Sequence, residues 1–130
     1  MASHTLANIL FVALGSGIGG ASRYVLSKVI QENSTSGFPL GTLIVNITGC
    51  LLLGIIYAFI EKGSEMGDGM KLFLTVGLCG GFTTFSTFMN DNLLMLNDSK
   101  LWWSIVYLIA SVAGGFLLLY AGYRLINYLL

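Results

Sequence analysis

Apolar residues run along the chain in four long stretches that are separated by short polar connectors. The stretches cover residues 6–30, 42–60, 70–96 and 101–128. A helix needs about 20 mainly apolar residues to cross a bilayer, so each stretch is long enough to span one. The connectors, QENSTSGFPL, EKGSEMGDG and NDSK, are rich in polar and turn-forming residues. We therefore predict an all-α membrane protein, with a single four-helix transmembrane domain over residues 1–130.

The composition favours the same class of protein. Hydrophobic residues make up 55% of the chain and the mean hydropathy is +0.83. Charged residues are only 9%, against about 25% in ordinary globular domains, and could not cover the surface of a soluble domain. The formal net charge is zero, which offers no basic field for nucleic acid. We expect the lipid bilayer as a partner and no nucleic acid.

The residues that usually carry catalysis or bind metals are scarce. His4 is the only histidine, and Cys50 and Cys79 lie in apolar stretches without CxxC spacing. We interpret the cysteines as small buried hydrophobes rather than a disulfide or a metal site. With no nucleophile, base and orienting group converging in the sequence, we do not expect an enzyme.

One glycine motif in the first stretch has two interpretations. GSGIGG, at residues 15–20, matches the G-x-G-x-x-G of dinucleotide-binding turns. The acidic residue expected about 20 residues later is absent, however. Gly15 and Gly19 also give the small-xxx-small spacing of closely packed membrane helices, which Ala110 and Gly114 repeat in the fourth stretch. We expect helix packing at both places.

The third stretch contains GLCGGFTTFSTF, at residues 77–88, which is the least helix-favouring sequence of any apolar stretch. It holds three glycines and four hydroxyl side chains: Gly77, Gly80, Gly81, Thr83, Thr84, Ser86 and Thr87. Such a composition predicts a helix broken at mid-membrane depth, where freed carbonyls can hold a cation and freed amides an anion. The alternative is a packing notch, with the hydroxyls bonded to their own helix.

Three further side chains in the apolar stretches could face a permeation path. Phe85 and Phe88 are three residues apart and share one helix face. They are either packing residues or rings whose positive edges attract an anion. Asn46 lies near the middle of the second stretch, where an amide serves either as a bond between helices or as a donor to a path.

The distribution of basic residues gives no orientation in the membrane. Lys62, Lys71 and Arg124 fall on one side of a four-span chain, and Arg23, Lys28 and Lys100 on the other. The positive-inside rule then counts three against three. Either these charges are wrongly assigned to helix ends, or the chain inserts in both orientations and pairs antiparallel. We favour dual insertion.

GTLIVN, ASRY and above all CGGFTTFSTF, together with the four-span length, resemble the small bacterial fluoride channels called CrcB or Fluc. The resemblance covers essentially the whole chain. It implies an antiparallel, dual-topology homodimer in the bacterial inner membrane that exports fluoride passively and lowers its toxicity. It also implies a structural sodium ion, Na+, at the dimer centre.

The resemblance further implies roles for individual residues. The sodium ion would be held by the backbone carbonyls of Gly80 and Thr83. The fluoride pathway would be lined by Asn46, Phe85, Phe88, Thr42 and Ser111. Arg23 would lie near the vestibule.

Two residues depart from the family pattern. Gly115 stands where relatives can carry serine, which predicts a polar series on the fourth helix that is either thinner or water-filled at that level. Asp91 stands where many relatives have glutamate, and it is also the only candidate for the membrane acid of a proton-coupled four-helix exporter. That exporter, and a membrane scaffold without transport activity, are the alternative functions.

Overall fold

The expected apolar helices are present in the computed structural model, which describes residues 2–130. The elements are α1 (Ala2–Glu32), α2 (Leu40–Glu61), α3 (Asp68–Leu72), η1 (Phe73–Cys79), α4 (Gly80–Phe82), α5 (Phe85–Asn97) and α6 (Leu101–Leu129). Four helical stretches are long and apolar enough to cross a membrane: His4–Glu32, Leu40–Glu61, Asp68–Asn97 and Leu101–Leu129. The third of these is assembled from α3, η1, α4 and α5.

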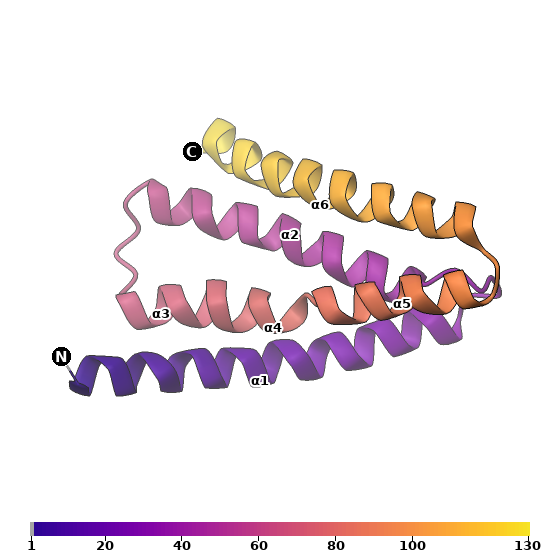
Figure 1. Cartoon of the computed structure of the whole chain (residues 1–130). Coiled ribbons are helices and arrows are strands. Elements are labelled where there is room, and N and C mark those ends of the chain that lie inside the picture. The colour runs from indigo at the N-terminus through magenta and orange to yellow at the C-terminus, as the bar shows by residue number, and fades with distance from the viewer. Residues whose placement is uncertain (1) are drawn as a thin grey trace.

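The chain passes back and forth along one direction (Figure 1). Both termini lie at one end of the bundle, together with the connector between α2 and α3. The helix α1 packs along the first half of the third stretch, and α2 packs along α6. The bundle is therefore two pairs of helices, and neither of these main pairs joins consecutive spans.

Glycines set the close approach between α1 and the third stretch. A Cβ atom added to Gly77 would lie 2.9 Å from the Cα of Gly15, and one added to Gly81 would lie 2.7 Å from the carbonyl oxygen of Ser16. A Cβ on Gly15 or Gly19 would meet the backbone of η1 or α4 in return. The helix-packing interpretation of the GSGIGG motif is thus confirmed.

Glycines also allow the backbones of α2 and α6 to approach closely. A Cβ atom on Gly122 would lie 2.7 Å from the carbonyl oxygen of Leu51. A Cβ on Gly54 would collide with the backbone of Leu119. At Gly114, the glycine of the second small-xxx-small pair, a Cβ would lie 3.4 Å from Ile47 Cγ2, which is ordinary contact. The tightest approach between α2 and α6 is therefore at Gly54 and Gly122.

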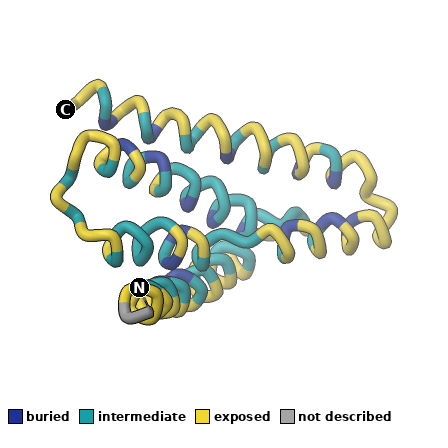
Figure 2. The backbone as a smooth tube through the Cα atoms, turned by 60° about the vertical axis from the view of Figure 1, so that its left-hand side comes forward, coloured by how far each residue is buried: buried dark blue, intermediate teal, exposed yellow. Residues whose placement is uncertain are grey.

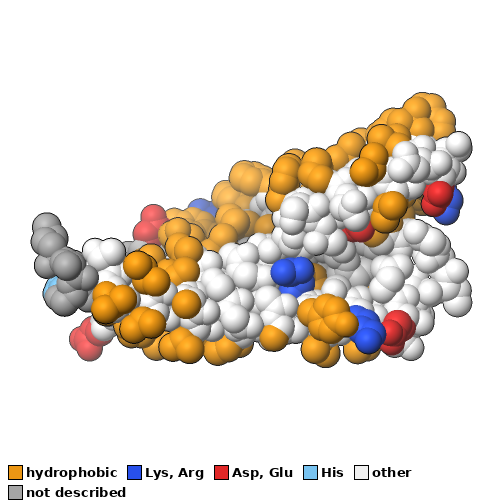
Figure 3. Space-filling view, turned by 60° about the horizontal axis from the view of Figure 1, so that its bottom comes forward, with side chains coloured by type: hydrophobic (Ala, Val, Ile, Leu, Met, Phe, Trp, Pro, Cys, Tyr) orange, Lys and Arg blue, Asp and Glu red, His pale blue; other side chains and the backbone are white. Residues whose placement is uncertain are grey.

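Few side chains are buried within the single chain. A small core at one end joins Phe88, Met95 and Tyr107, with Phe38 and Leu43 packed against it. Elsewhere the exposed positions run along the outer faces of the helices (Figure 2), and apolar side chains cover much of the surface that Figure 3 displays. This apolar exterior fits contact with lipid or with another membrane-embedded chain.

The sequence expectations for the cysteines fit the structure. Cys79 is buried, Cys50 is half-buried, and both are free thiols. At the two ends of α6, Trp102 is 77% exposed and Tyr128 is 88% exposed, as suits aromatic residues at a membrane–water interface.

Candidate functional site

The third stretch leaves the helical path at Thr83 and Thr84. Thr83 has φ −99° and ψ 157°, and Thr84 has φ −149° and ψ 122°. Gly80, by contrast, keeps right-handed helical angles of −63° and −40°. Gly77, Gly80 and Gly81 all lie within helical turns, and the departure from the helix comes after them, within residues 77–88. Gly77 and Gly81 lack a side chain where the third stretch packs closely against the backbone of α1.

The turns before this interruption are wider than an α-helix. Residues Phe73–Cys79 form a π-helix of 7 residues, which is unusual because π-turns normally occur singly and often at functional sites. The third stretch is therefore not a regular α-helix even before Thr83.

The interruption removes the usual hydrogen-bond donors of two carbonyl groups. In a continuous α-helix the carbonyls of Gly80 and Thr83 would accept from the amides of Thr84 and Thr87. The Thr84 amide donates instead to Asn46 Oδ1 at 2.8 Å, and the Thr87 amide donates to Thr84 Oγ1 at 3.2 Å. The Thr83 amide donates to the Cys79 carbonyl at 3.1 Å. Gly80 and Thr83 are thus left with carbonyl oxygens suited to a cation.

Asn46 joins α2 to the interruption through both ends of its amide. Besides accepting from the Thr84 amide, it donates from Nδ2 to the Thr84 carbonyl oxygen at 3.1 Å. Within the single chain Asn46 is therefore a bond between helices, and it holds the extended residue that replaces a helical turn.

Arg23 also bonds to the backbone near the interruption. Its Nε donates to the Gly81 carbonyl oxygen at 3.0 Å, and this contact is part-buried. The residue predicted at the vestibule therefore reaches from α1 toward α4. The neighbouring carbonyl oxygens therefore differ in their hydrogen-bond partners. That of Gly81 accepts from the Arg23 guanidinium, whereas those of Gly80 and Thr83 have lost their helical donors.

One pocket brings most of the predicted site residues together. It has a volume of about 250 Å³ and is lined by Asn46, Cys50, Thr83, Thr84, Phe85, Phe88, Ser111 and Val112. Among the described residues, the buried hydroxyl oxygen of Ser111 has no hydrogen-bond partner. The pocket therefore combines aromatic rings from α5 with hydroxyl groups from the interruption and from α6.

The two phenylalanines have different environments in this pocket. Their ring centroids are 6.0 Å apart with an interplanar angle of 66°, an edge-to-face arrangement. Phe88 is only 5% exposed, whereas Phe85 is 72% exposed. Phe88 thus belongs to the core of this chain, while Phe85 is presented on its surface.

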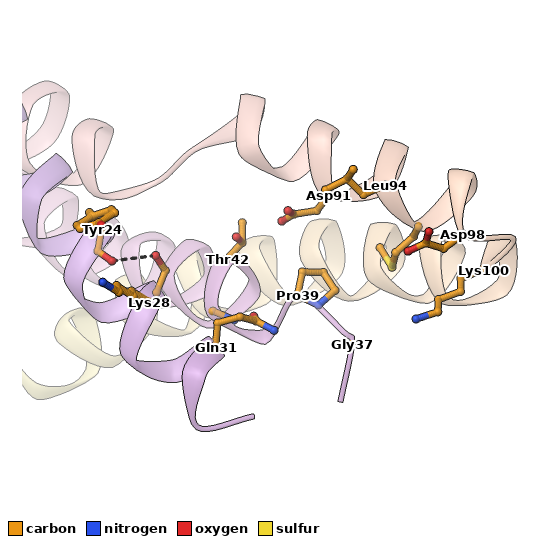
Figure 4. A pocket seen from close by; sticks show the side chains of 13 residues that line it. Tyr24, Lys28, Gln31, Gly37, Pro39, Thr42, Asp91, Leu94, Asp98 and Lys100 are labelled. Atoms are coloured by element: carbon orange, nitrogen blue, oxygen red, sulfur yellow. Dashed lines mark hydrogen bonds between the residues drawn. The ribbon is translucent and has the colours of Figure 1, made fainter. Parts of the chain in front are cut away.

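Thr42 lies in a second, larger pocket and not with Asn46. This pocket has a volume of about 420 Å³ and lies near the connector between α1 and α2 (Figure 4). Thr42 and Asp91 point toward each other there, with Lys28 and Lys100 also in the lining. Its walls carry basic, acidic and hydroxyl groups, so the pocket can hold water and hydrated ions.

Tyr107 connects the two pockets and was missed from the sequence. Its hydroxyl donates to Asp91 Oδ2 at 2.8 Å, and its ring packs edge-to-face on Phe88 with centroids 4.9 Å apart. The carboxylate of Asp91 is therefore part of a polar contact between α5 and α6. The signal available was spacing, since Tyr107 lies one helical turn before Ser111 and away from the ends of its span.

Thr84 was the other functional residue that sequence reasoning left without a specific role. It is the N-cap of α5, with a side chain that accepts from the Thr87 amide. A threonine at the start of a helix-favouring segment was the available sign of a cap.

The chain has clear relatives among known proteins. Residues 10–123 match the family described as CrcB-like protein, Camphor Resistance (CrcB). A protein of Flavobacterium psychrophilum is 38% identical over 114 residues, which are 88% of this chain and 92% of that protein. A protein of Shewanella halifaxensis is 40% identical over 119 residues (92% and 95%), and one of Phocaeicola vulgatus is 42% identical over 110 residues (85% and 90%). All three are named fluoride-specific ion channel FluC.

Proposed function

Because the chain belongs to the CrcB-like family, we propose that it is a fluoride-selective ion channel that lets fluoride leave the cell passively. It is a multi-pass membrane protein and a channel rather than an enzyme. The observation that carries the proposal is the similarity to fluoride channels over most of the chain. The pocket that gathers Asn46, Phe85, Phe88 and Ser111 supports it.

Fluoride is a small and strongly hydrated anion, so a path through the membrane must replace its water. Hydroxyl groups such as that of Ser111 can donate hydrogen bonds to it, and the edges of Phe85 and Phe88 offer weak positive charge. None of these groups carries a full positive charge. Each therefore binds the ion weakly enough to release it, as conduction requires.

The working unit is an antiparallel homodimer. Phe85 is 72% exposed in the single chain, so a path lined by its ring needs a further surface to close it. Arg23 is bonded inside the bundle, which leaves Lys62, Lys71 and Arg124 at one end against Lys28 and Lys100 at the other. So small a bias in charge permits both orientations. Labelling of single-cysteine variants from each side of the membrane tests this, and one orientation alone would refute it.

A structural sodium ion lies at the centre of this dimer, held by the carbonyls of Gly80 and Thr83 from both copies. The diverted amides of Thr84 and Thr87 support this assignment. So does the space at Gly80, where an added Cβ would meet only the Thr75 carbonyl oxygen, at 3.7 Å. When bound, a sodium ion supplies positive charge between the two interruptions, which then lie at mid-membrane depth.

The deciding experiment measures fluoride efflux from proteoliposomes with a fluoride electrode and repeats it with chloride. Fast fluoride loss without a proton gradient, together with negligible chloride loss, is the expected result. Transport that requires a proton gradient or moves organic cations would favour the small exporter. Absence of any flux from a folded dimer would favour the scaffold. In bacterial cells we expect the protein in the inner membrane, and membrane fractionation tests this.

A further inference from the structure

The pocket that holds Asn46 also contains a thiol to which neither the sequence pattern nor the proposed function gives a role. Cys50 lies one helical turn after Asn46 on α2 and lines the same pocket as Phe85, Phe88 and Ser111. The other cysteine, Cys79, is only 3% exposed. The two thiols thus differ in their access to the pocket.

The position of this thiol is linked to a glycine on the opposite helix. Gly115 follows Ser111 by one turn on α6, so the two share a helix face. A Cβ atom at Gly115 would lie 3.3 Å from Cys50 Sγ, which is closer than ordinary van der Waals contact. The sulfur therefore occupies the space where a side chain at position 115 would lie. The Cys50 side chain on α2 therefore fills the gap that we expected in the polar series at Gly115.

A thiol in this place can act on an anion. Its S–H group is a weak hydrogen-bond donor, and its uncharged form leaves the path without extra negative charge. The neighbouring Ser111 oxygen is buried and has no partner among the described residues, so this part of the pocket lacks hydrogen-bonding partners within the chain. A mobile ion or its water would satisfy both groups.

We propose that Cys50 is a further lining residue of the fluoride pathway. Its thiol continues the polar series beyond Ser111, in place of the side chain that Gly115 lacks, and donates a hydrogen bond to fluoride or to the water that accompanies it. This role rests on the proposed channel function.

The first test compares fluoride efflux from proteoliposomes of the wild type and of Cys50→Ala, Cys50→Ser and Cys79→Ala. We expect Cys50→Ala to lower the flux by roughly two- to tenfold, the size of effect of one neutral hydrogen bond. Cys50→Ser keeps a donor and should keep most of the flux. Cys79→Ala is the matched control and should conduct like the wild type. Size-exclusion chromatography confirms that each variant has the oligomeric state of the wild type.

The second test uses the coupling with Gly115. Gly115→Ser combined with Cys50→Ala places a hydroxyl where the sulfur was, so the double variant should recover flux that Cys50→Ala alone has lost. Methyl methanethiosulfonate, a small thiol reagent, should block the wild type and Cys79→Ala but not Cys50→Ala.

Each outcome of these tests is decisive. Normal flux of folded Cys50→Ala, or a block by the reagent that persists in that variant, would overturn the role of Cys50 while leaving the channel function intact. A wild-type protein that carries no fluoride would overturn the channel function itself, and this role with it.

Discussion

Asn46 and Thr84 are joined by two hydrogen bonds, one to the Thr84 amide at 2.8 Å and one to its carbonyl at 3.1 Å. A single side chain on α2 thus satisfies both backbone groups of a residue that has left the helix 38 positions away. This pairing makes an extended residue tolerable within an apolar bundle, where an unsatisfied backbone group is costly.

Replacement of Asn46 by aspartate should strongly reduce fluoride flux. The carboxylate would face the Thr84 carbonyl without a donor and would add a negative charge beside the path. We expect a loss of more than roughly tenfold, equivalent to about 1.4 kcal/mol in the barrier, measured as efflux from proteoliposomes. Asn97→Asp, at an exposed position at the end of α5, is the matched control and should conduct normally. Robust flux through Asn46→Asp would exclude Asn46 from the path.

Replacement of Phe85 or Phe88 by isoleucine should sharply reduce fluoride flux because the ring edges are lost. Phe88 is buried, so its variant should also lose stability, by about 1–3 kcal/mol for the buried volume that isoleucine does not fill. Phe85 is 72% exposed, and its variant therefore tests conduction with little loss of packing in the chain. Phe59→Ile, on α2, serves as a control. Unchanged flux in Phe85→Ile would show that its ring has only a packing role.

Replacement of Tyr107 by phenylalanine removes the hydroxyl that donates to Asp91 at 2.8 Å and keeps the ring that packs on Phe88. We expect a loss of about 1.5–3 kcal/mol in the free energy of unfolding, because the bond is to a charged group. Thermal unfolding in detergent measures it. If the midpoint does not change, the contact with Asp91 contributes nothing to stability.

The glycines that face α1 can be tested against one that faces open space. Gly81→Ala should destabilise the bundle, because its Cβ would lie 2.7 Å from the Ser16 carbonyl oxygen. A Cβ at Gly17 would meet no atom within 4 Å, so Gly17→Ala should stabilise α1 by about 1 kcal/mol through helix propensity. Thermal unfolding compares the two. Equal effects would mean that α1 and α4 do not pack this closely.

A substitution at Gly80 tests formation of the dimer separately from folding of the single chain. A Cβ atom added at Gly80 has the Thr75 carbonyl oxygen, at 3.7 Å, as its nearest contact outside its own helical turn, yet it would lie between the two copies in the proposed dimer. Gly80→Val should therefore fold but dimerise weakly, and exchange of sodium for a large organic cation should weaken the wild-type dimer in the same way. Analytical ultracentrifugation measures both. A stable Gly80→Val dimer would place the sodium site elsewhere.

The helices could be predicted because each depends on its own stretch of sequence. A long apolar run must satisfy its backbone internally, so 42–60 could hardly be anything but a helix. The position of the break could not be predicted in the same way. Local propensity pointed to the glycines, but their role is contact with α1, and the chain leaves the helix at Thr83 and Thr84, which Asn46 holds from another helix.

The residues of the candidate site also fall into those that the sequence could predict and those that it could not. Asn46, Phe85, Phe88 and Ser111 could be proposed from chemistry and resemblance, and one pocket contains all four. Tyr107 was not proposed, because its only sequence signal was its spacing of one helical turn from Ser111, and its importance arises from its neighbours on α5.

The pairing of α2 with α6 has a consequence for how the protein assembles during its synthesis. Synthesis proceeds from the N-terminus, and α6 is the last helix to leave the ribosome, so α2 enters the membrane well before its main neighbour exists. During that interval the face that holds Gly54 has only lipid beside it. The α2–α6 pair can therefore form only after all four spans are inserted, and a chain truncated before residue 101 would keep the pairing of α1 with the third stretch but leave α2 without its main neighbour.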